Sequence, residues 1–418
     1  MKTNPITNLS VAIMAAFTII CFAACSSDND LNVDEVDDSN AVEPTVLQLT
    51  NKEANTVDQL NQLSFDMNTS VAGSFADANG PANYTFSPLS VETNLSLIAN
   101  SLDEPQRSKI LKMLGYDNLD ELNAFNAKLY KYLCDKGNGV EMNLASSVWH
   151  DDAYSLNSHY TTEMDRIFDA EVYRKDFASP LTVTEINTWA AKKTKNMIDC
   201  VLKEMPAQKL LWINAMYFFG RWDEPFDKNA TDRQKFNGIS GSKNVDMMHK
   251  QDIIAHSEVN SWQMVSLPFK TLAYQCMFIL PTSTASISDF NADIYDSLLG
   301  TLKGKEVTLS LPRFKIKSEI NLKSTLSELG MPDKELRFTS MGLPESYVQN
   351  GLSIGQAAKI ELDEEGARLA AVTQHWTTST GEIPQYEKVK VDFNRPFIFV
   401  VRHMSSGAIL MIGRVCDI

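Results

Sequence analysis

The sequence lacks the short motifs by which most enzyme active sites are recognised. No GxSxG nucleophile motif occurs, because the GISG stretch at residues 238–241 is one residue short. Residues 300–306 are likewise one residue too short for a phosphate-binding loop, and Glu306 stands where such a loop carries serine or threonine. The six histidines form no HExxH motif and none is closely paired with cysteines, which argues against a metal site. We therefore predict no catalytic residues, no metal and no cofactor.

Basic side chains are also scarce. Lys and Arg number 38 against 53 Asp and Glu, which gives a formal net charge of −15. This balance excludes a nucleic-acid-binding surface, because such a surface needs clustered cations. The acidic run Asp363, Glu364 and Glu365 does not supply a glycosidase pair, since those carboxylates come from separate elements that face each other across a cleft. We expect this charge run to be solvated.

Cysteines are few and irregularly spaced, and no CxxC motif occurs. Regular spacing would indicate a disulfide framework or a metal site. An exported protein could still pair its cysteines, but their scatter favours isolated and mostly buried thiols. This prediction concerns Cys134, Cys200, Cys276 and Cys416.

The first 24 residues resemble a bacterial lipoprotein signal peptide. Lys2 precedes an apolar run over residues 11–24 that is too short to span a bilayer, and small residues lead directly into Cys25. In bacterial lipoproteins this cysteine carries the lipid, whereas an ordinary secretory signal would leave Cys25 unmodified. Residues 25–50 are acidic, contain no basic residue and are predicted to be a disordered tether. We expect an exported protein, held by its lipid at the outer membrane or cell surface of a Gram-negative-type bacterium.

From residue 51 onward the pattern indicates one α+β domain rather than the two or three that the length allows. An apolar face recurs at helical spacing from Leu60 to Phe75, and Ser87 followed by Pro88 is typical of a helix start. Further helices are predicted over residues 106–114, 119–133, 159–168, 185–198, 289–299 and 321–329. Strands are predicted over residues 140–148, 210–219 (buried on both faces), 245–248, 262–267, 273–280, 307–317, 397–403 and 408–415.

Residues 357–395 contain a long loop that belongs to none of the predicted helices and strands. Ile360 and Leu362 alternate with charged residues in a strand that we expect to end at Gly366, and Val389 and Val391 alternate in a second strand. The polar stretch between them is too long for a hairpin turn. Long loops without secondary structure in a compact domain are usually functional or disordered.

Eight segments, taken in order, resemble the serpin family of protease inhibitors. Each is a weak signal alone, but their order and spacing together are specific, and they extend from about residue 51 to the C-terminus. They are FSPLS (86–90), NAMYFFGRWDEPF (214–226), VDMM (245–248), LPRF (311–314), LSELG (326–330), DEEG (363–366), FNRPF (393–397) and MIGRV (411–415).

The resemblance implies an α+β serpin fold, with three antiparallel β-sheets surrounded by eight or nine α-helices and an exposed reactive-centre loop, in residues 51–418. It implies a monomer that is not an enzyme. A serine or cysteine endopeptidase attacks the loop and becomes trapped as an acyl-enzyme when the cleaved loop inserts into the central sheet. The residues that correspond to the family's breach and shutter, which lie at and beneath the insertion site, are Trp222, Asn214, Ser87, Ser90 and Gln356.

The same resemblance places the hinge at the start of the loop. Small residues are needed here because alternate side chains must enter a packed sheet. Leu369 is larger than the alanine usual at its position, and an extra isobutyl group can cost about 1–3 kcal/mol. The hinge comprises Glu364, Glu365, Gly366, Ala367, Arg368, Leu369, Ala370, Ala371 and Val372.

The reactive bond follows from a count of about sixteen positions beyond Glu364, since the inserted strand has a fixed rise per residue. This count gives Thr380 followed by Gly381, with Ser379 within its range and Trp376 and Gln385 as outside candidates. No Lys or Arg lies between residues 368 and 388. Trypsin-like enzymes need a basic residue, so the sequence favours an elastase-like or subtilisin-like target.

Three functions compete at this point. The first is an inhibitory serpin tethered to the cell surface. The second is a serpin-fold protein that is only cleaved, or that acts as a binding module or carrier, as Leu369 would allow. The third is an unrelated surface lipoprotein that binds glycans or peptides, which the ordered motifs disfavour. Formation of a covalent protease complex distinguishes the first from the second.

Overall fold

The described part of the chain has a long helix as its first element and continues with alternating groups of helices and strands. The computed structural model describes residues 46–77, 80–133, 140–282, 285–352, 354–367 and 385–418. These residues belong to one unit that covers residues 38–418. They contain eight α-helices, and none of these is both long enough and apolar enough to span a membrane. The helices are α1 (Asn51–Ser74), α2 (Pro88–Ser101), α3 (Gln106–Met113), α4 (Leu119–Leu133), α5 (Ser158–Phe168), α6 (Pro180–Lys193), α7 (Ala292–Gly300) and α8 (Lys323–Glu328).

Local capping chemistry explains where two of these helices begin and end. The predicted start of α2 is confirmed: the Ser87 hydroxyl accepts a 3.1 Å hydrogen bond from the backbone N–H of Ser90, and Pro88 is the first helical residue. The predicted helix over residues 185–198 is wrong at both ends. Helix α6 already begins after the cap residue Ser179, and it ends at Lys193 because Lys195 and Asn196 adopt positive φ.

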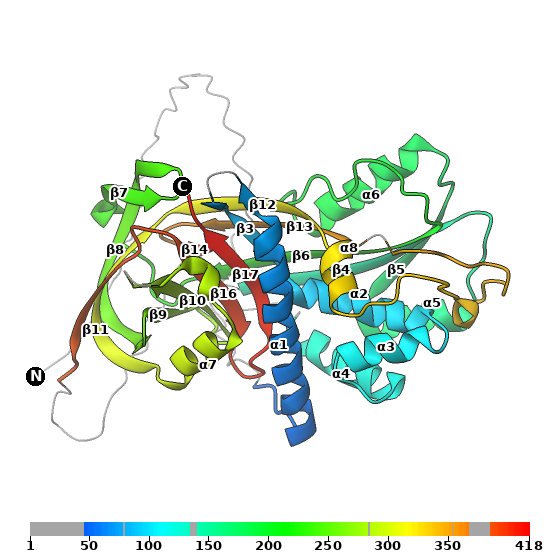
Figure 1. The fold of residues 1–418 in the computed structure, drawn as a ribbon, viewed down its shortest axis with the longest axis horizontal. Coiled ribbons are helices and arrows are strands. Elements are labelled where there is room, and N and C mark those ends of the chain that lie inside the picture. Colours follow the sequence, from blue (N-terminus) through cyan, green and yellow to red (C-terminus); the bar gives the residue numbers. More distant parts are fainter. Residues whose placement is uncertain (1–45, 78–79, 134–139, 283–284, 353, 368–384) are drawn as a thin grey trace, which may run out of the picture. The chain divides into compact units, whose positions relative to one another are not determined.

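The larger sheet combines two of the layers expected for the fold. The strand order is β15-β11-β8-β9-β10-β16-β17-β3, with β7 paired to β8. Strand β8 is 19 residues long and passes from the β7–β11 side into the β9–β10 side, which links the two layers (Figure 1). The strands are β3 (Tyr84–Phe86), β7 (Asp232–Gly238), β8 (Gly241–Val259), β9 (Trp262–Pro268), β10 (Tyr274–Pro281), β11 (Lys303–Pro312), β15 (Lys388–Asp392), β16 (Phe397–His403) and β17 (Ile409–Val415).

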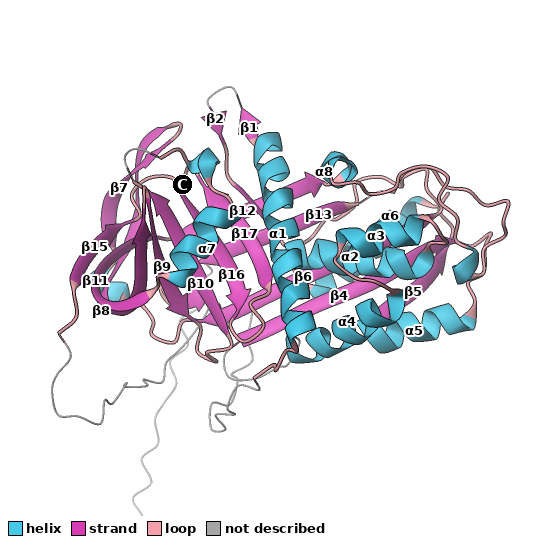
Figure 2. Cartoon of the chain, turned by 60° about the horizontal axis from the view of Figure 1, so that its bottom comes forward, coloured by secondary structure: helices cyan, strands magenta, loops and turns pink. Residues whose placement is uncertain are grey.

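The remaining strands form two groups and a short hairpin. One group has the order β14-β6-β4-β5, and the other is the pair β12-β13. Figures 1 and 2 show β12 and β13 running beside β6 and β4. The strands are β4 (Val140–Asp151), β5 (Ala170–Lys175), β6 (Leu210–Arg221), β12 (Phe314–Asn321), β13 (Gly355–Leu362) and β14 (Gly366–Ala367), with β1 (Ala76–Asp77) and β2 (Gly80–Pro81) as the hairpin.

Two strand predictions are corrected here. Residues 307–317 are not one strand, because Pro312 ends β11 and the backbone N–H of Arg313 donates to Asp246, so that β12 begins in another sheet. The strand expected to end at Gly366 ends at Leu362, and a turn through residues 364–365 precedes β14.

Strand β6 is covered on both faces in its first half only, and the antiparallel strand β4 is covered in its second half, which pairs with that part of β6. Leu211 and Ala215 pack against Trp189 and Ile186 of α6, whereas alternate residues such as Trp212 face α2 in the main core. From residue 213 onward most of β6 is half-buried. The prediction of a strand buried along both faces is therefore wrong for its second half, where α6 has ended and β13 is not joined.

Candidate functional site

The central sheet is divided between β6 and β13. Strand β6 pairs with β4 along one edge, and β13 pairs with β12 along one edge. No backbone ladder joins the facing edges of β6 and β13 among the described residues. At the end of β6, Gly366 pairs with Arg221 and Ala367 pairs with Gly220, so β14 occupies the first positions of the unjoined edge. The chain entering the loop thus already lies where an added strand would begin.

Gly366 is required at this point by both conformation and space. Its φ of +135° is a conformation that residues with a side chain rarely adopt. A Cβ atom at this position would lie 2.6 Å from the backbone oxygen of Gly220 and 2.6 Å from the nitrogen of Trp222. The hinge can approach β6 this closely only because residue 366 has no side chain.

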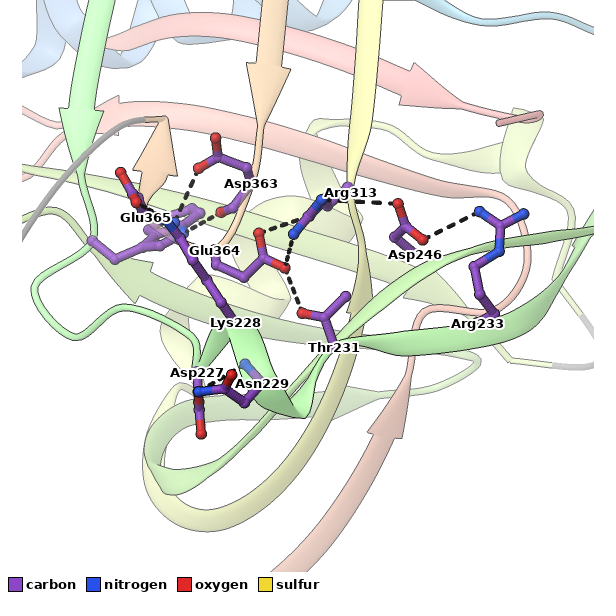
Figure 3. A network of polar contacts seen from close by, with 11 residues as sticks. Asp227, Lys228, Asn229, Thr231, Arg233, Asp246, Arg313, Asp363, Glu364 and Glu365 are labelled. Carbon is purple, nitrogen blue, oxygen red and sulfur yellow. Dashed lines mark hydrogen bonds and ion pairs between the residues drawn. The ribbon is translucent and has the colours of Figure 1, made fainter. Parts of the chain in front are cut away.

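Glu364 anchors the hinge through an ion pair in which the carboxylate is buried and the arginine is partly exposed (Figure 3). Its side chain is only 2% exposed, and Arg313, just before β12, reaches it with Nε at 2.7 Å and Nη2 at 2.5 Å. The Thr231 hydroxyl donates to the same carboxylate. Two charge-assisted bonds in a bidentate geometry are among the stronger polar contacts in proteins. They connect the hinge to the start of β12.

The protonation of Glu364 follows from these contacts. Burial by itself raises the pKa of this carboxyl, but the bonds from Arg313 and Thr231 outweigh burial and lower the pKa below its ordinary value. The neighbouring Glu365 pairs with Lys228, and Asp246 lies between Arg313 and Arg233. The prediction that this acidic run is simply solvated is therefore wrong for Glu364.

Trp222 closes the site at the end of β6. It is 1% exposed and its ring stacks on Phe269 at a centroid distance of 4.9 Å. Its indole N–H donates to the carbonyl of Asp363 at 3.1 Å, and its backbone N–H donates to the carbonyl of Glu365 at 3.2 Å. Trp222 therefore holds the turn between β13 and β14 by two bonds.

The predicted shutter residues meet beneath the unjoined edges. The Gln356 amide on β13 binds both backbone groups of Ser87, accepting at 2.7 Å and donating at 2.9 Å. The Ser87 hydroxyl donates to the carbonyl of Leu410. Asn214 on β6 instead donates to Ser146 and does not reach Gln356. The shutter contacts thus tie β13 to α2, and β6 to β4. They connect β13 to β6 only through Ser87, whose hydroxyl also lies 3.2 Å from the sulfur of Met216 on β6.

The segment after α6 crosses in front of both halves of the divided sheet. Lys195 pairs with Glu141 on β4, and Asp199 pairs with Lys317 on β12, each at 2.6 Å. Each pair is exposed, so each contributes little alone and weakens with salt. Together they connect the two halves across the place where a strand would enter.

Several predicted residues lie outside the described part of the chain. These are the later hinge residues Arg368, Leu369, Ala370, Ala371 and Val372, the bond candidates Trp376, Ser379, Thr380 and Gly381, and Cys25 and Cys134. Gln385 is described and exposed, and Cys200, Cys276 and Cys416 are free thiols. Within the described ranges, no three histidine, cysteine or acidic side chains are grouped to hold a metal ion.

Sequence reasoning did not identify Arg313, Thr231 or Lys228 as parts of the site. The LPRF segment that contains Arg313 served only to recognise the family. Glu364 and Arg313 are 51 residues apart, so no local spacing indicates their contact. The sequence offers an arginine between two strands and an acidic run directly after Leu362, and these can be matched only when the pairing of β12 with β13 is known.

The central sheet is divided between β6 and β13, and the small residues Gly366 and Ala367 lie at the end of the unjoined edge of β6. The family model for serpins, serine protease inhibitors, matches residues 59–418, and the chain belongs to this family. It is 26% identical to Serpin-ZX of Arabidopsis thaliana, over 80% of this chain and 92% of that protein. It is also 26% identical to plasminogen activator inhibitor 1 of Neovison vison, over 85% of this chain and 92% of that protein. The native structure of the thermophilic serpin tengpin matches with a TM-score of 0.77 at 24% identity, covering 90% of this chain and 98% of that chain, which confirms the predicted fold.

Proposed function

We propose that this serpin inhibits an endopeptidase as a suicide substrate. A serine or cysteine protease attacks the loop, forms an acyl-enzyme and is carried along when the freed hinge inserts between β6 and β13. The bond forms between the nucleophile and the carbonyl carbon of residue 380, and the new amine leaves on Gly381. The chain itself contributes no catalytic group.

The observation that supports this proposal is the position of β14. Gly366 and Ala367 pair with β6 at the end of an edge that no other described strand occupies. Insertion can therefore continue as an extension of an existing ladder. Starting a new ladder would require the loop ends to be ordered first, at a cost in chain entropy.

The free energy that insertion of the loop as a strand can release is comparable to the stability of a protease domain. An inserted strand of roughly a dozen residues makes a dozen or more backbone hydrogen bonds at about 0.5–1.5 kcal/mol each. The sum is of order ten kcal/mol, which matches the stability of a whole domain. Such a gain is sufficient to deform a captured protease, as the proposal requires.

The target class and the mechanism are tested together by incubating the protein with pancreatic elastase, subtilisin or trypsin. We expect elastase or subtilisin to form an adduct that survives denaturing gel electrophoresis, and we expect loop cleavage to raise the melting temperature strongly. An adduct with trypsin alone would contradict the proposed specificity. Cleavage without any adduct and without a rise in melting temperature would contradict inhibition.

The Ala367→Arg substitution is the matched control. Residue 367 is paired with Gly220, so a long cation here should stop the ladder at its second position. We expect this variant to be cleaved at the same rate as the original protein but to release the protease. A variant that still traps the enzyme would argue against insertion.

Leu369 supports a second function, in which the loop is cleaved but the protease escapes. Slower insertion lets deacylation finish first, and the protein is then a substrate, a binding module or a carrier on a serpin fold. Leu369→Ala should raise the fraction of attacks that end in a trapped complex. An unchanged fraction would show that Leu369 does not limit insertion.

We propose that the protein acts at a bacterial surface as a lipid-anchored monomer. The support is the N-terminal pattern that ends at Cys25 and the acidic stretch that follows. Cys25→Ser should shift the protein from the membrane fraction to the soluble fraction of a Gram-negative host. Equal membrane association of both forms would contradict lipid attachment at this residue.

A further inference from the structure

The chain that enters the loop leaves β13 through a tight hairpin, which fixes the register of any longer inserted strand. Asp363 and Gly366 exchange backbone hydrogen bonds of 3.2 and 3.0 Å across the turn at residues 364–365. On the other side, Ala367 pairs with Gly220 at the end of β6. In an antiparallel ladder, each step forward along one strand is a step back along its neighbour. The partners of the next residue are therefore determined on both sides.

The next residue to enter is Arg368. One step along each ladder places residue 368 opposite Phe219 on β6 and opposite Glu361 on β13. Since opposite residues point to the same side of a sheet, the guanidinium would lie on the face that carries these two side chains. Arg368 is the first charged side chain of an inserted strand that begins at Gly366.

Phe219 and Glu361 lie on the outer face of the divided sheet. On β13 the neighbouring Leu362 is buried, whereas the Glu361 side chain is 45% exposed. On β6 the neighbouring Phe218 packs against the main core, so Phe219 points outward, with its ring parallel to that of Tyr217 at a centroid distance of 6.5 Å. An aromatic surface on one edge and a carboxylate on the other thus border the place that residue 368 would take.

The groups at this place suit a guanidinium. Glu361 already binds two cations, Lys315 on β12 at 2.6 Å and Lys359 at 2.7 Å, which shows that its carboxylate is available on the outer face. An arginine directly opposite can reach the same carboxylate in a bidentate geometry. Its flat face can at the same time rest on the ring of Phe219, since aromatic faces attract cations.

The more distant charges do not outweigh this contact. The diagonal neighbours of residue 368 would be the cations Lys359 and Arg221 and the acid Asp363. Diagonal pairs are farther apart than directly opposite ones and interact more weakly. An acid at residue 368 would face Glu361 directly, and like charges directly opposite each other destabilise a sheet. The outer face therefore favours the arginine that the sequence provides.

We propose that Glu361 and Phe219 are positioning residues for loop insertion, which receive the guanidinium of Arg368 when the third residue of the strand enters. This inference rests on the proposed function, because it needs a loop that inserts as a strand. Gly366 and Ala367 are already paired with β6 in the intact protein, so Arg368 makes the first new contact. This contact favours extension of the ladder over return of the loop, and so favours trapping over release of the protease.

The test is a charge-swap cycle, read on the protein after subtilisin has cleaved its loop and has been inactivated. Arg368→Glu and Glu361→Arg should each reduce the rise in melting temperature that cleavage causes by about 1–3 °C. Each should also lower the trapped fraction of the preferred enzyme about three- to fivefold, and the double variant should recover most of both losses. A merely structural role of Glu361 would lower the melting temperatures of cleaved and uncleaved protein alike, without rescue by Arg368→Glu.

Phe219→Leu tests the aromatic half of the site. Leucine keeps an apolar side chain but offers no aromatic face to a cation. We expect this variant to reduce the rise in melting temperature in the original protein but not in the Arg368→Glu background. Equal reductions in both backgrounds would overturn the role of Phe219, because its contribution would then be independent of the arginine.

Glu319→Arg combined with Arg368→Glu is the matched control for the charge swap. Glu319 on β12 is 43% exposed and pairs with Lys203 at 2.6 Å, so it resembles Glu361 in exposure and in having a lysine partner. It lies opposite Ala357, four residues along β13 from Glu361, and should not rescue Arg368→Glu. Equal rescue by either arginine would overturn the proposal, and so would an unchanged rise in melting temperature in both single variants.

The melting temperature after cleavage separates this inference from the proposed function. Cleavage without any rise in the original protein would overturn both, because no strand would have entered. A rise without a trapped enzyme would contradict inhibition alone, and the charge-swap cycle on the cleaved protein would still decide the role of Glu361.

Discussion

Between about pH 4.5 and pH 8, we expect the ionisation of one buried carboxyl group to destabilise the folded protein. Glu92 lies in α2 with 7% exposure and accepts a 3.1 Å hydrogen bond from the Ser64 hydroxyl on α1. Burial raises the pKa of Glu92 from its ordinary value of 4.5 to about 8. Glu92 is therefore a neutral acid in the fold at neutral pH.

The sign and size of the change in stability follow from the difference between the pKa of Glu92 in the folded protein and in the unfolded chain. The folded state holds the proton more tightly than the unfolded chain, so the free energy of unfolding falls as pH rises from about 4.5 to about 8 and is then constant. At about 1.4 kcal/mol per pH unit, the loss is about 5 kcal/mol. For a domain of this size the loss corresponds to about 6 °C in melting temperature. The adjacent Tyr116 does not titrate in this range, because its burial and then the Glu92 charge raise its pKa far above the ordinary value.

The Glu92→Gln substitution removes the titrating group but keeps an oxygen that can accept from Ser64. Urea unfolding followed at pH 5, 7 and 9 should show similar stability for both proteins at the lowest pH and a more stable variant at the highest. Glu345→Gln, which changes an exposed carboxylate, is the matched control and should leave the pH slope unchanged. Parallel pH profiles for the original protein and Glu92→Gln would refute the reasoning.

Three further predictions concern the site. Glu364→Gln removes the charge that its arginine partner binds and should lower the free energy of unfolding by about 2–4 kcal/mol above pH 5 in urea titrations, with the difference shrinking as acid protonates the original carboxylate. Gly366→Ala should push β14 off Gly220 and lower the trapped fraction in gel assays. Lys317→Met, which breaks the pair with Asp199, should speed insertion by up to about fivefold at low salt and by less in about 0.5 M salt, as measured by the rate of adduct formation.

Local chemistry made much of the fold predictable from the sequence. The cap at Ser87, the helix at Leu119–Leu133 and the strand at Phe397–His403 each depend on residues close in the chain, and each is observed as predicted. Predictions failed where pairing between distant strands decides the outcome. The run from Val307 to Lys317 has apolar residues at 307, 309 and 311 and then at 314 and 316, so the alternation shifts by one residue at Pro312. This shift marks a break, but it does not show that the two parts join different sheets.

The contacts of the hinge also depend on pairing between distant strands, so they could not be predicted from the sequence. The residues expected in the hinge were chosen by resemblance, and Glu364 was expected to be solvated because three acids in a row usually are. It is buried because Arg313 ends up beside it through the pairing of β12 with β13. Ion pairs between distant segments carry no periodic signal in a sequence, so the anchor of the hinge could be found only once the strands were placed.

The place where a strand would insert also holds buried polar atoms that have no hydrogen-bond partner among the described residues. The Ser90 hydroxyl on α2 and the side-chain oxygen of Asn214 on β6 are buried and accept or donate no hydrogen bond among the described residues. A buried polar group left in this state costs about 1–3 kcal/mol, so an entering strand could recover this energy in addition to its ladder bonds. The cost of seating Leu369 is of the same size. Leu369 therefore cannot reverse an insertion that gains of order ten kcal/mol, and its effect must be on the rate at which insertion competes with release of the protease.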